Sequence, residues 1–214
     1  MPELIINEIF HSIQGESSRA GLPCVFVRLT GCNLRCSYCD TEYAFTEGTP
    51  MSVDEIEATV HSYGCTLVEV TGGEPLMQDA VHELLRRLCN NGYEVLLETG
   101  GSLDISMVDR RVRRIIDLKC PGSGMMKKNL WSNIEQLKPT DEVKFVIGSR
   151  EDFDWAANVI REHGIDRRSQ MLMSAVFGSL TPLQLSEWIL ESGLHVRFQL
   201  QLHKYIWEPS ARGV

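Results

Sequence analysis

The sequence predicts an α/β fold, an incomplete (trimmed) β/α barrel of about six parallel strands. Three observations lead to this prediction. Short apolar runs recur along the chain, amphipathic helical segments lie between most of them, and a glycine follows several of those segments. A complete eight-unit barrel needs about 250 residues, and this chain has 214. The alternative is an open doubly wound sheet, which produces the same local pattern.

The runs that predict strands are short, apolar and rich in β-branched residues. They cover residues 25–29, 66–70, 93–97, 114–118, 143–147, 170–173 and 196–200. Since helical segments separate most of them, the chain offers repeated strand–helix units along its whole length.

Helix boundaries between these runs are marked by capping signals. Ser52 with Glu55 forms a capping box, and Thr181-Pro182, with Gln184 three residues after Thr181, marks another helix N-terminus. A third helix is predicted within 76–89, where apolar side chains share one face. Glycines that end a helical segment before a strand are Gly64, Gly92, Gly164 and Gly193. The order of helix, glycine and strand favours parallel βαβ units, which place the functional site at the carboxyl ends of the strands.

The composition limits the classes of function. The formal net charge is −8, from 21 Lys+Arg and 29 Asp+Glu, so we expect no direct nucleic-acid partner. No apolar run reaches the length of a membrane span, and the N-terminus lacks the pattern of a signal peptide. We therefore expect one cytoplasmic domain over 1–214, with no membrane partner.

Seven cysteines are unusual in such a chain, because a reducing compartment disfavours disulfides. Four are scattered, and we interpret them as packed small side chains. These four are Cys24, Cys65, Cys89 and Cys120. The other three, Cys32, Cys36 and Cys39, form a C-x3-C-x2-C pattern directly after the first predicted strand. They therefore share a loop at the carboxyl end of that strand.

Three chemistries suit this triplet. A structural zinc site would need a fourth ligand, for which the fold could supply His11 or Cys120. A redox dithiol needs only Cys36 and Cys39, and it leaves Cys32 unexplained. A four-iron cluster held by three thiolates uses all three cysteines and leaves one iron open to a ligand. The iron–sulfur interpretation is favoured because spacing, ligand number and position agree with it.

The C-x3-C-x2-C pattern, with Tyr38 before its last cysteine, resembles the signature of radical S-adenosylmethionine (SAM) enzymes. Residues 71–75, Thr-Gly-Gly-Glu-Pro, resemble that family's motif for the SAM amino group. Taken alone, 71–75 would be an ordinary strand-to-helix turn. The resemblance implies that SAM chelates the open iron of a 4Fe-4S cluster. Reduction then cleaves SAM to a 5′-deoxyadenosyl radical.

Further segments resemble one branch of this family. That branch contracts 6-carboxy-5,6,7,8-tetrahydropterin to 7-carboxy-7-deazaguanine with loss of ammonia, in queuosine and 7-deazapurine biosynthesis. The segments are 9–16, 40–41, 98–102 and 201–205, and the match runs from about Glu8 to Pro209. The resemblance implies a lyase that regenerates SAM, requires Mg2+ and uses a flavodoxin-like electron donor. A trimmed barrel exposes strand edges, so we expect a homodimer.

The resemblance also assigns roles to single residues. The catalytic cluster is held by Cys32, Cys36 and Cys39. The substrate is bound by Ile13, Gln14, Gly15, Arg28, Thr71 and His203. SAM is bound by Tyr38, Cys39, Asp40, Gly73, Glu74, Asp117, Leu118, Lys119, Ser174, Ala175, Val176 and Phe177. The Thr41 hydroxyl ligates Mg2+. Arg28 is expected to meet the substrate carboxylate and Glu74 to complement the SAM ammonium.

Other interpretations of these residues stay open. Arg28 could be an ordinary ion-pair residue and His203 a structural histidine. The charged groups Glu98, Glu142 and Lys144 could support the site or form solvated ion pairs. A glycyl-radical-enzyme activase would share the cluster and the 71–75 motif without needing Mg2+. A zinc-stabilised module without catalysis is the alternative from another class.

The sequence departs from some members of this branch in two places. Some end at the proline equivalent to Pro209 and use its carboxylate on the substrate. Here residues 210–214 follow, and Glu208 or Val214 is expected to substitute. Others carry a long insertion between the first two cluster cysteines, whereas the spacing here is compact.

Overall fold

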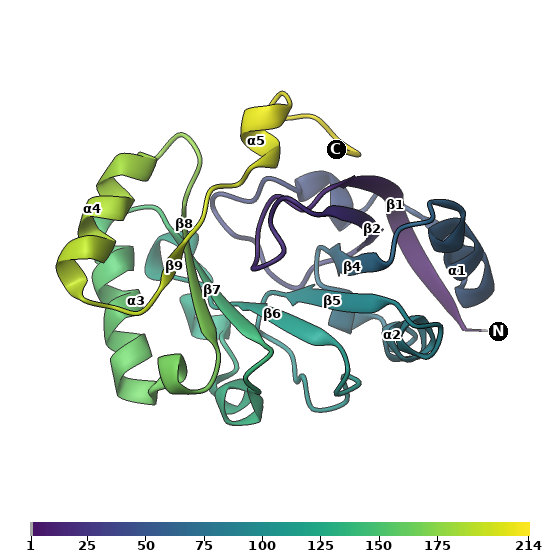
Figure 1. The fold of residues 1–214 in the computed structure, drawn as a ribbon, viewed down its shortest axis with the longest axis horizontal. Helices are drawn as coiled ribbons and strands as arrows, with labels where there is room; N and C mark the ends of the chain where they lie inside the picture. The colour runs from purple at the N-terminus through teal and green to yellow at the C-terminus, as the bar shows by residue number, and fades with distance from the viewer. Residues whose placement is uncertain (1) are drawn as a thin grey trace.

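The computed structural model describes residues 2–214, which form one nine-stranded sheet flanked by helices (Figure 1). Across the sheet the strands follow the order β3-β1-β2-β4-β5-β6-β7-β8-β9. Every neighbouring pair from β2 to β9 is parallel, whereas β1 is antiparallel to both of its neighbours. Because β3 and β9 form its edges, the sheet is open, as an incomplete barrel requires.

The strands are β1 (Glu3–Ile13), β2 (Pro23–Leu29), β3 (Thr49–Ser52), β4 (Leu67–Gly72), β5 (Glu94–Thr99), β6 (Arg113–Asp117), β7 (Glu142–Ile147), β8 (Gln170–Ala175) and β9 (Arg197–Phe198). The helices are α1 (Val53–Ser62), α2 (Val81–Asn90), α3 (Arg150–His163), α4 (Pro182–Ser192) and α5 (His203–Ile206). Short 3-10 turns, among them Pro75–Met77, lie in the connections.

All of the predicted strands are present, as β2 and β4 to β9, so the parallel strands number seven rather than about six. Two further strands, β1 and β3, were not predicted. In β1 the alternation of apolar side chains is interrupted by a bulge between Ile6 and Glu8. β3 is short and contains Pro50, which an edge strand tolerates. Neither strand has the continuous apolar run of the buried parallel strands.

The predicted helix signals are confirmed where they concern capping. Capping boxes form at Ser52 before α1 and at Thr181 before α4. The glycines of the predicted helix ends all have positive φ angles, as expected for left-handed caps. These are Gly64, Gly92, Gly164 and Gly193. The helix predicted within 76–89 begins later, at Val81, because Pro75–Met77 forms a separate turn.

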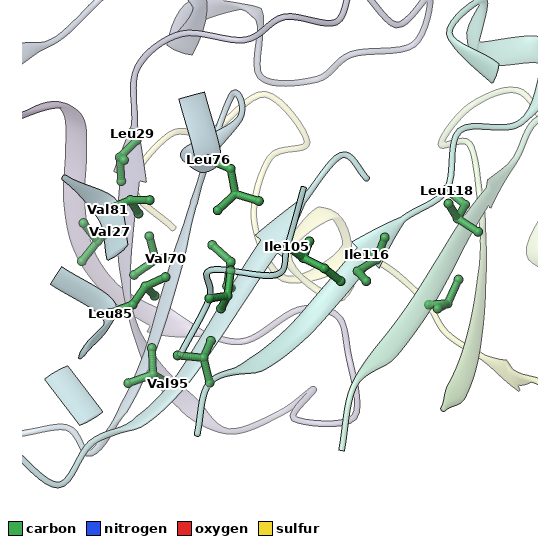
Figure 2. Packing of buried hydrophobic residues seen from close by; sticks show 14 of the residues in the cluster. Val27, Leu29, Val70, Leu76, Val81, Leu85, Val95, Ile105, Ile116 and Leu118 are labelled. Carbon is green, nitrogen blue, oxygen red and sulfur yellow. The ribbon is translucent and has the colours of Figure 1, made fainter. Parts of the chain in front are cut away.

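The main hydrophobic core lies between one face of the sheet and helices α1 to α4. Figure 2 shows Val27, Val70 and Ile116 of the strands with Val81 and Leu85 of α2 in this core. Full burial of such a side chain contributes roughly 1.5–3 kcal/mol. A doubly wound sheet would carry helices on both faces. The one-sided packing therefore favours the incomplete barrel.

The opposite face of the sheet is apolar in the first part of the strands and charged towards their carboxyl ends. Phe10 and Phe26 stack at 4.9 Å between ring centroids and pack with Leu96 and Ile115 in a small second cluster. Side chains two residues apart point to the same side of a strand. The next positions on this face, towards the carboxyl ends of the strands, are all charged. They are Arg28, Glu69, Glu98, Asp117 and Lys144.

The scattered cysteines lie in or against the packed interior. Cys24 and Cys120 are fully buried, and Cys65 and Cys89 are half-buried beside the core. Within residues 2–214 every cysteine is a free thiol. These positions confirm the interpretation of the four as packed small side chains. No helix in this range has the length and apolar character needed to cross a membrane.

Candidate active site

A cavity of about 750 Å³ opens at the carboxyl ends of the parallel strands. Its walls come from the inner face of the sheet, the loop after β2 and the C-terminal segment around α5, which is yellow in Figure 1. The predicted site residues that line it are Ile13, Gln14, Gly15, Arg28, Cys32, Cys36, Tyr38, Cys39, Asp40, Thr41, Thr71, Gly73, Asp117, Lys119, Val176, Phe177 and His203. The fold thus gathers most of the predicted residues around one space.

Four predicted SAM-binding residues do not line this cavity: Glu74, Leu118, Ser174 and Ala175. The side chain of Leu118 packs in the main core. Glu74 is completely buried, and its carboxylate accepts hydrogen bonds from Thr99 Oγ1 and from the backbone N–H of Gly100 at 2.8 Å. Both carboxylate oxygens thus accept hydrogen bonds within the chain, and the contact with the SAM ammonium stays a prediction. Glu74 ties the turn after β4 to the end of β5.

The cysteine loop is held against the neighbouring turns. Ser37 donates from its backbone N–H to the Ser123 carbonyl at 3.0 Å and from its hydroxyl to the Gly122 carbonyl at 2.7 Å. On the other side, a Cβ on Gly73 would lie 2.2 Å from the Gly31 carbonyl oxygen. The loop and the turn after β4 are therefore in direct contact, and glycine is required at position 73.

The three thiols are half-buried and face the same cavity. Burial raises the pKa of each thiol, and Lys119 acts in the opposite direction on all three. A nearby cation favours the thiolate, which is the form that binds metal. The donor set therefore suits a soft metal centre in contact with the cavity.

The two residues that could complete a zinc site lie away from the cysteine loop or are packed in the interior. Within residues 2–214, no group of three or more His, Cys, Asp or Glu side chains is compact enough to hold one ion. His11 packs against Tyr63, 5.8 Å between ring centroids, and Cys120 lies in the main core. A zinc ion would need such a compact group. A four-iron cluster uses all three thiols of the loop, each on a different iron atom, and needs no fourth protein ligand.

A buried charged network forms the floor of the cavity. The Lys144 Nζ lies 2.9 Å from Glu16 Oε2 and 3.8 Å from Asp117 Oδ2, and it also donates to Glu98. Burial opposes the charged form of Lys144, but these carboxylates outweigh it and raise its pKa well above the usual range. Lys144 and Glu98 are thus part of a buried network rather than a solvated pair. Glu142 lies apart and accepts from the backbone N–H of Ser18 at 3.0 Å.

Asp117 belongs to this charged network, and one of its carboxylate oxygens makes no hydrogen bond within the described chain. Its Oδ2 is 2.8 Å from the Lys119 Nζ. Its Oδ1 is buried and has no hydrogen-bond partner within the described chain. Because buried polar atoms are rarely left unpaired, an acceptor in this position suits the hydroxyl groups of a bound ligand. This observation fits the predicted role of Asp117 in binding SAM.

Arg28 also lines the cavity, and it contacts Glu8 and Tyr43, which were not predicted as site residues. Its Nε donates to Glu8 Oε1 at 2.8 Å, and the Tyr43 hydroxyl donates to the same oxygen at 3.0 Å. The guanidinium carbon stands 5.7 Å from the centroid of the Phe10 ring. Within residues 2–214 no partner is found for its terminal nitrogens, so they can receive a carboxylate.

The C-terminal segment closes the cavity from above. Lys204 pairs with Asp40 at 2.6 Å and stands 5.6 Å from the Phe177 ring centroid. Although burial opposes it, Lys204 lowers the pKa of Asp40 to about 2. The pair therefore stays ionised well below neutral pH. Val214 lines the cavity, whereas Glu208 does not.

The fold and the loop that carries three cysteines define a radical SAM domain. A family model described as the radical SAM superfamily matches residues 26–179. The 7-carboxy-7-deazaguanine synthase of Chlorobaculum tepidum is 51% identical over 99% of this chain and 97% of its own length. The synthase of the same name from Koribacter versatilis is 44% identical over 98% and 99%. Among solved structures, QueE from Escherichia coli has the same fold, with a TM-score of 0.76, 21% identity and coverage of 92% and 93%.

This chain belongs to the radical SAM superfamily and, within it, to the 7-carboxy-7-deazaguanine synthase family. Membership implies a 4Fe-4S cluster and SAM as cofactors. The three thiols and the unpaired Asp117 oxygen fit these two groups.

Proposed function

We propose that this enzyme converts 6-carboxy-5,6,7,8-tetrahydropterin to 7-carboxy-7-deazaguanine and ammonia. The observation that carries the proposal is one cavity with the three cysteines on its wall and Arg28 available to an anion. The cluster and SAM, when bound, supply the one-electron chemistry that removes a hydrogen atom from carbon. The name of the relatives from Chlorobaculum tepidum and Koribacter versatilis supports this reaction.

The residues of this chain bind, orient and shield the substrate. Arg28 binds the substrate carboxylate, and Glu8 and Tyr43 hold the guanidinium in place. Phe10 and Phe26 form an apolar surface on which a flat ring can lie. The C-terminal segment excludes water from above. Such positioning keeps the substrate in one orientation during the reaction.

We further propose that Mg2+ binds at the Thr41 hydroxyl, which lines the cavity and donates to Asp40 Oδ1 at 2.9 Å. Mg2+ prefers oxygen ligands and retains several waters, so substrate oxygens would complete its shell. Adding a chelator of Mg2+ should lower product formation without removing iron. An unchanged rate in the chelated sample would count against this site.

The proposed reaction is tested with protein that has been reconstituted with iron and sulfide under anaerobic conditions. Incubation with the carboxytetrahydropterin, SAM and a reductant should give 7-carboxy-7-deazaguanine, detected by mass spectrometry. A glycyl-radical-enzyme activase would instead leave the pterin intact. Absence of the deazaguanine from an iron-loaded sample would reject the proposal.

Replacing Arg28 tests its role as the carboxylate-binding residue. Arg28→Gln should raise the KM for the pterin about 10- to 100-fold, because a charge-assisted hydrogen bond is lost. Iron content and SAM binding should stay at wild-type levels, since Arg28 does not touch the cysteines. Arg150→Gln, which loses an exposed pair with Asp154, is the control. Loss of the cluster in Arg28→Gln would show that the assignment is wrong.

Gly15→Ala tests the placement of His203. A Cβ on Gly15 would lie 2.4 Å from His203 Nδ1, so the imidazole would have to move. A displacement of this kind lowers turnover about 100-fold, while the iron content stays unchanged. His203→Ala removes the side-chain clash and leaves only the 3.1 Å approach to the backbone nitrogen of residue 203, so adding Gly15→Ala to it should cause a much smaller further loss. A full additional loss in the double variant would contradict the contact.

We propose four further properties of this enzyme. We propose that residues 1–214 form a single radical SAM domain, which the continuous sheet supports. We propose a homodimer that covers the exposed edge strands β3 or β9. We also propose that the enzyme acts in the cytoplasm and receives electrons from a flavodoxin-like protein.

A further inference from the structure

Glu69 is a buried carboxyl group of the cavity that has no role so far. It stands on β4 at a position facing the cavity, and the residue is 3% exposed. The Gln14 Nε2 donates to its Oε2. Its Oε1 has no hydrogen-bond partner in the described part of the chain and is not among the fully enclosed atoms. One oxygen of Glu69 is thus available to a ligand.

The orientation of Glu69 is fixed through Gln14. The Gln14 Oε1 accepts from the backbone N–H of Glu16 at 2.8 Å, so its Nε2 must point towards Glu69. The backbone of Gln14 is itself held by two hydrogen bonds of 2.8 Å, with Leu22 and Gly21. The oxygen of Glu69 that faces the cavity is therefore Oε1. Because Oε2 accepts from Gln14, a proton on this carboxyl group would sit on Oε1, and only the ionised group presents Oε1 purely as an acceptor.

Glu69 is not held by the cation of the cavity floor. Lys144 makes its contacts with Glu16, Glu98 and Asp117. Burial and the nearby Glu98 raise the pKa of Glu69 well above the usual range, and Lys144 only partly opposes this shift. An unpaired buried carboxyl is costly unless a ligand satisfies it.

Glu69 and Arg28 face the same cavity from adjacent strands. Arg28 pairs in register with Thr71, two residues beyond Glu69 on β4. The two positions are therefore separated by about 7 Å along the strands and about 5 Å across them. These positions suit opposite ends of a bicyclic substrate whose carboxylate is bound by Arg28. The far end of a pterin carries an exocyclic 2-amino group, which is a hydrogen-bond donor.

We propose that Glu69 is a specificity residue whose Oε1 accepts a hydrogen bond from the 2-amino group of the pterin. This inference rests on the proposed function. It predicts discrimination against a ring that carries an oxygen at this position, because a hydrogen bond from the 2-amino group stabilises the ionised carboxylate, whereas a ring oxygen would place two acceptors face to face.

The test compares the binding of 6-carboxypterin and 6-carboxylumazine, which has a 2-oxo group in place of the 2-amino group. Fluorescence titrations use the iron-loaded protein with SAM. Wild type should bind 6-carboxypterin at least about tenfold more tightly. Glu69→Leu should abolish the preference. Glu69→Gln should reverse it, because Gln14 would bind the new amide oxygen and leave the amide N–H group facing the ligand.

Glu142→Gln is the matched control, since Glu142 is also a buried carboxyl on the inner face but does not line the cavity. Its preference should equal that of wild type. A wild type without preference would overturn the inference even if no variant folds, and so would a Glu69→Gln variant that keeps the wild-type preference. Wild-type turnover of the carboxytetrahydropterin is measured in parallel. Product without discrimination would reject this inference alone, whereas absence of both product and binding would reject the proposed function as well.

Discussion

Replacing Cys36 with alanine should remove the iron–sulfur cluster and abolish turnover. Cys36 is one of three thiols that face the cavity from one loop, and two remaining thiolates cannot hold a cluster whose fourth iron is kept open for SAM. Wild type purified without oxygen should contain about four irons and as many sulfides per chain. Iron and sulfide assays, with a product assay on the same sample, measure the effect.

Cys89→Ala is the control for this experiment, since Cys89 is a half-buried thiol that packs against the core and lies outside the cavity. It should retain iron, sulfide and turnover. An iron-loaded and active Cys36→Ala protein would refute the assignment of the cluster. Colourless wild type without acid-labile sulfide would favour the zinc-stabilised module.

Lys144→Met should lower the free energy of unfolding by about 3–5 kcal/mol, because it leaves Glu16 and Glu98 without their cation, whereas Asp117 keeps Lys119. Lys144 is almost fully buried and contacts Glu16, Glu98 and Asp117. Removing one partner of a buried ion pair costs more than the pair itself contributes. Denaturation in urea measures the change, with the slope checked for an unaltered unfolding transition.

Two further variants separate this effect from a simple loss of charge. Arg150→Met removes the exposed pair with Asp154 and should cost less than about 1 kcal/mol. Adding Glu98→Gln to Lys144→Met should recover part of the lost stability, since one unpaired charge is removed. Equal losses in Lys144→Met and Arg150→Met would contradict the buried network.

The central parallel strands could be predicted from sequence because both of their faces are buried. A run such as 143–147 is apolar or paired throughout, and its boundaries match β7 closely. β1 escaped prediction because a bulge and polar residues interrupt its pattern. The start of α2 was placed too early because Leu76, which belongs to a 3-10 turn, has the spacing of a helical residue.

For the site too, some residues could be predicted from the sequence and others could not. The cysteine spacing identifies a metal loop, and the resemblance locates Arg28 and His203, which line the same cavity. The partners that hold these residues come from distant segments, as with Glu8 against Arg28. A single charged residue within a buried strand, such as Glu69 on β4, is the sequence signal that could have identified further residues of the cavity. The sequence does not show that Thr99 and Gly100 bind the Glu74 carboxylate, because they approach it only in the folded chain.

The ratio of ammonia, product and SAM tests the central claim most directly. One incubation of the iron-loaded protein with the carboxytetrahydropterin, Mg2+, reductant and a limiting amount of SAM supplies all three amounts. We expect one ammonia for each 7-carboxy-7-deazaguanine, and several products for each SAM, because the proposed reaction regenerates SAM. Product formation without ammonia, or consumption of one SAM for each product, would contradict it.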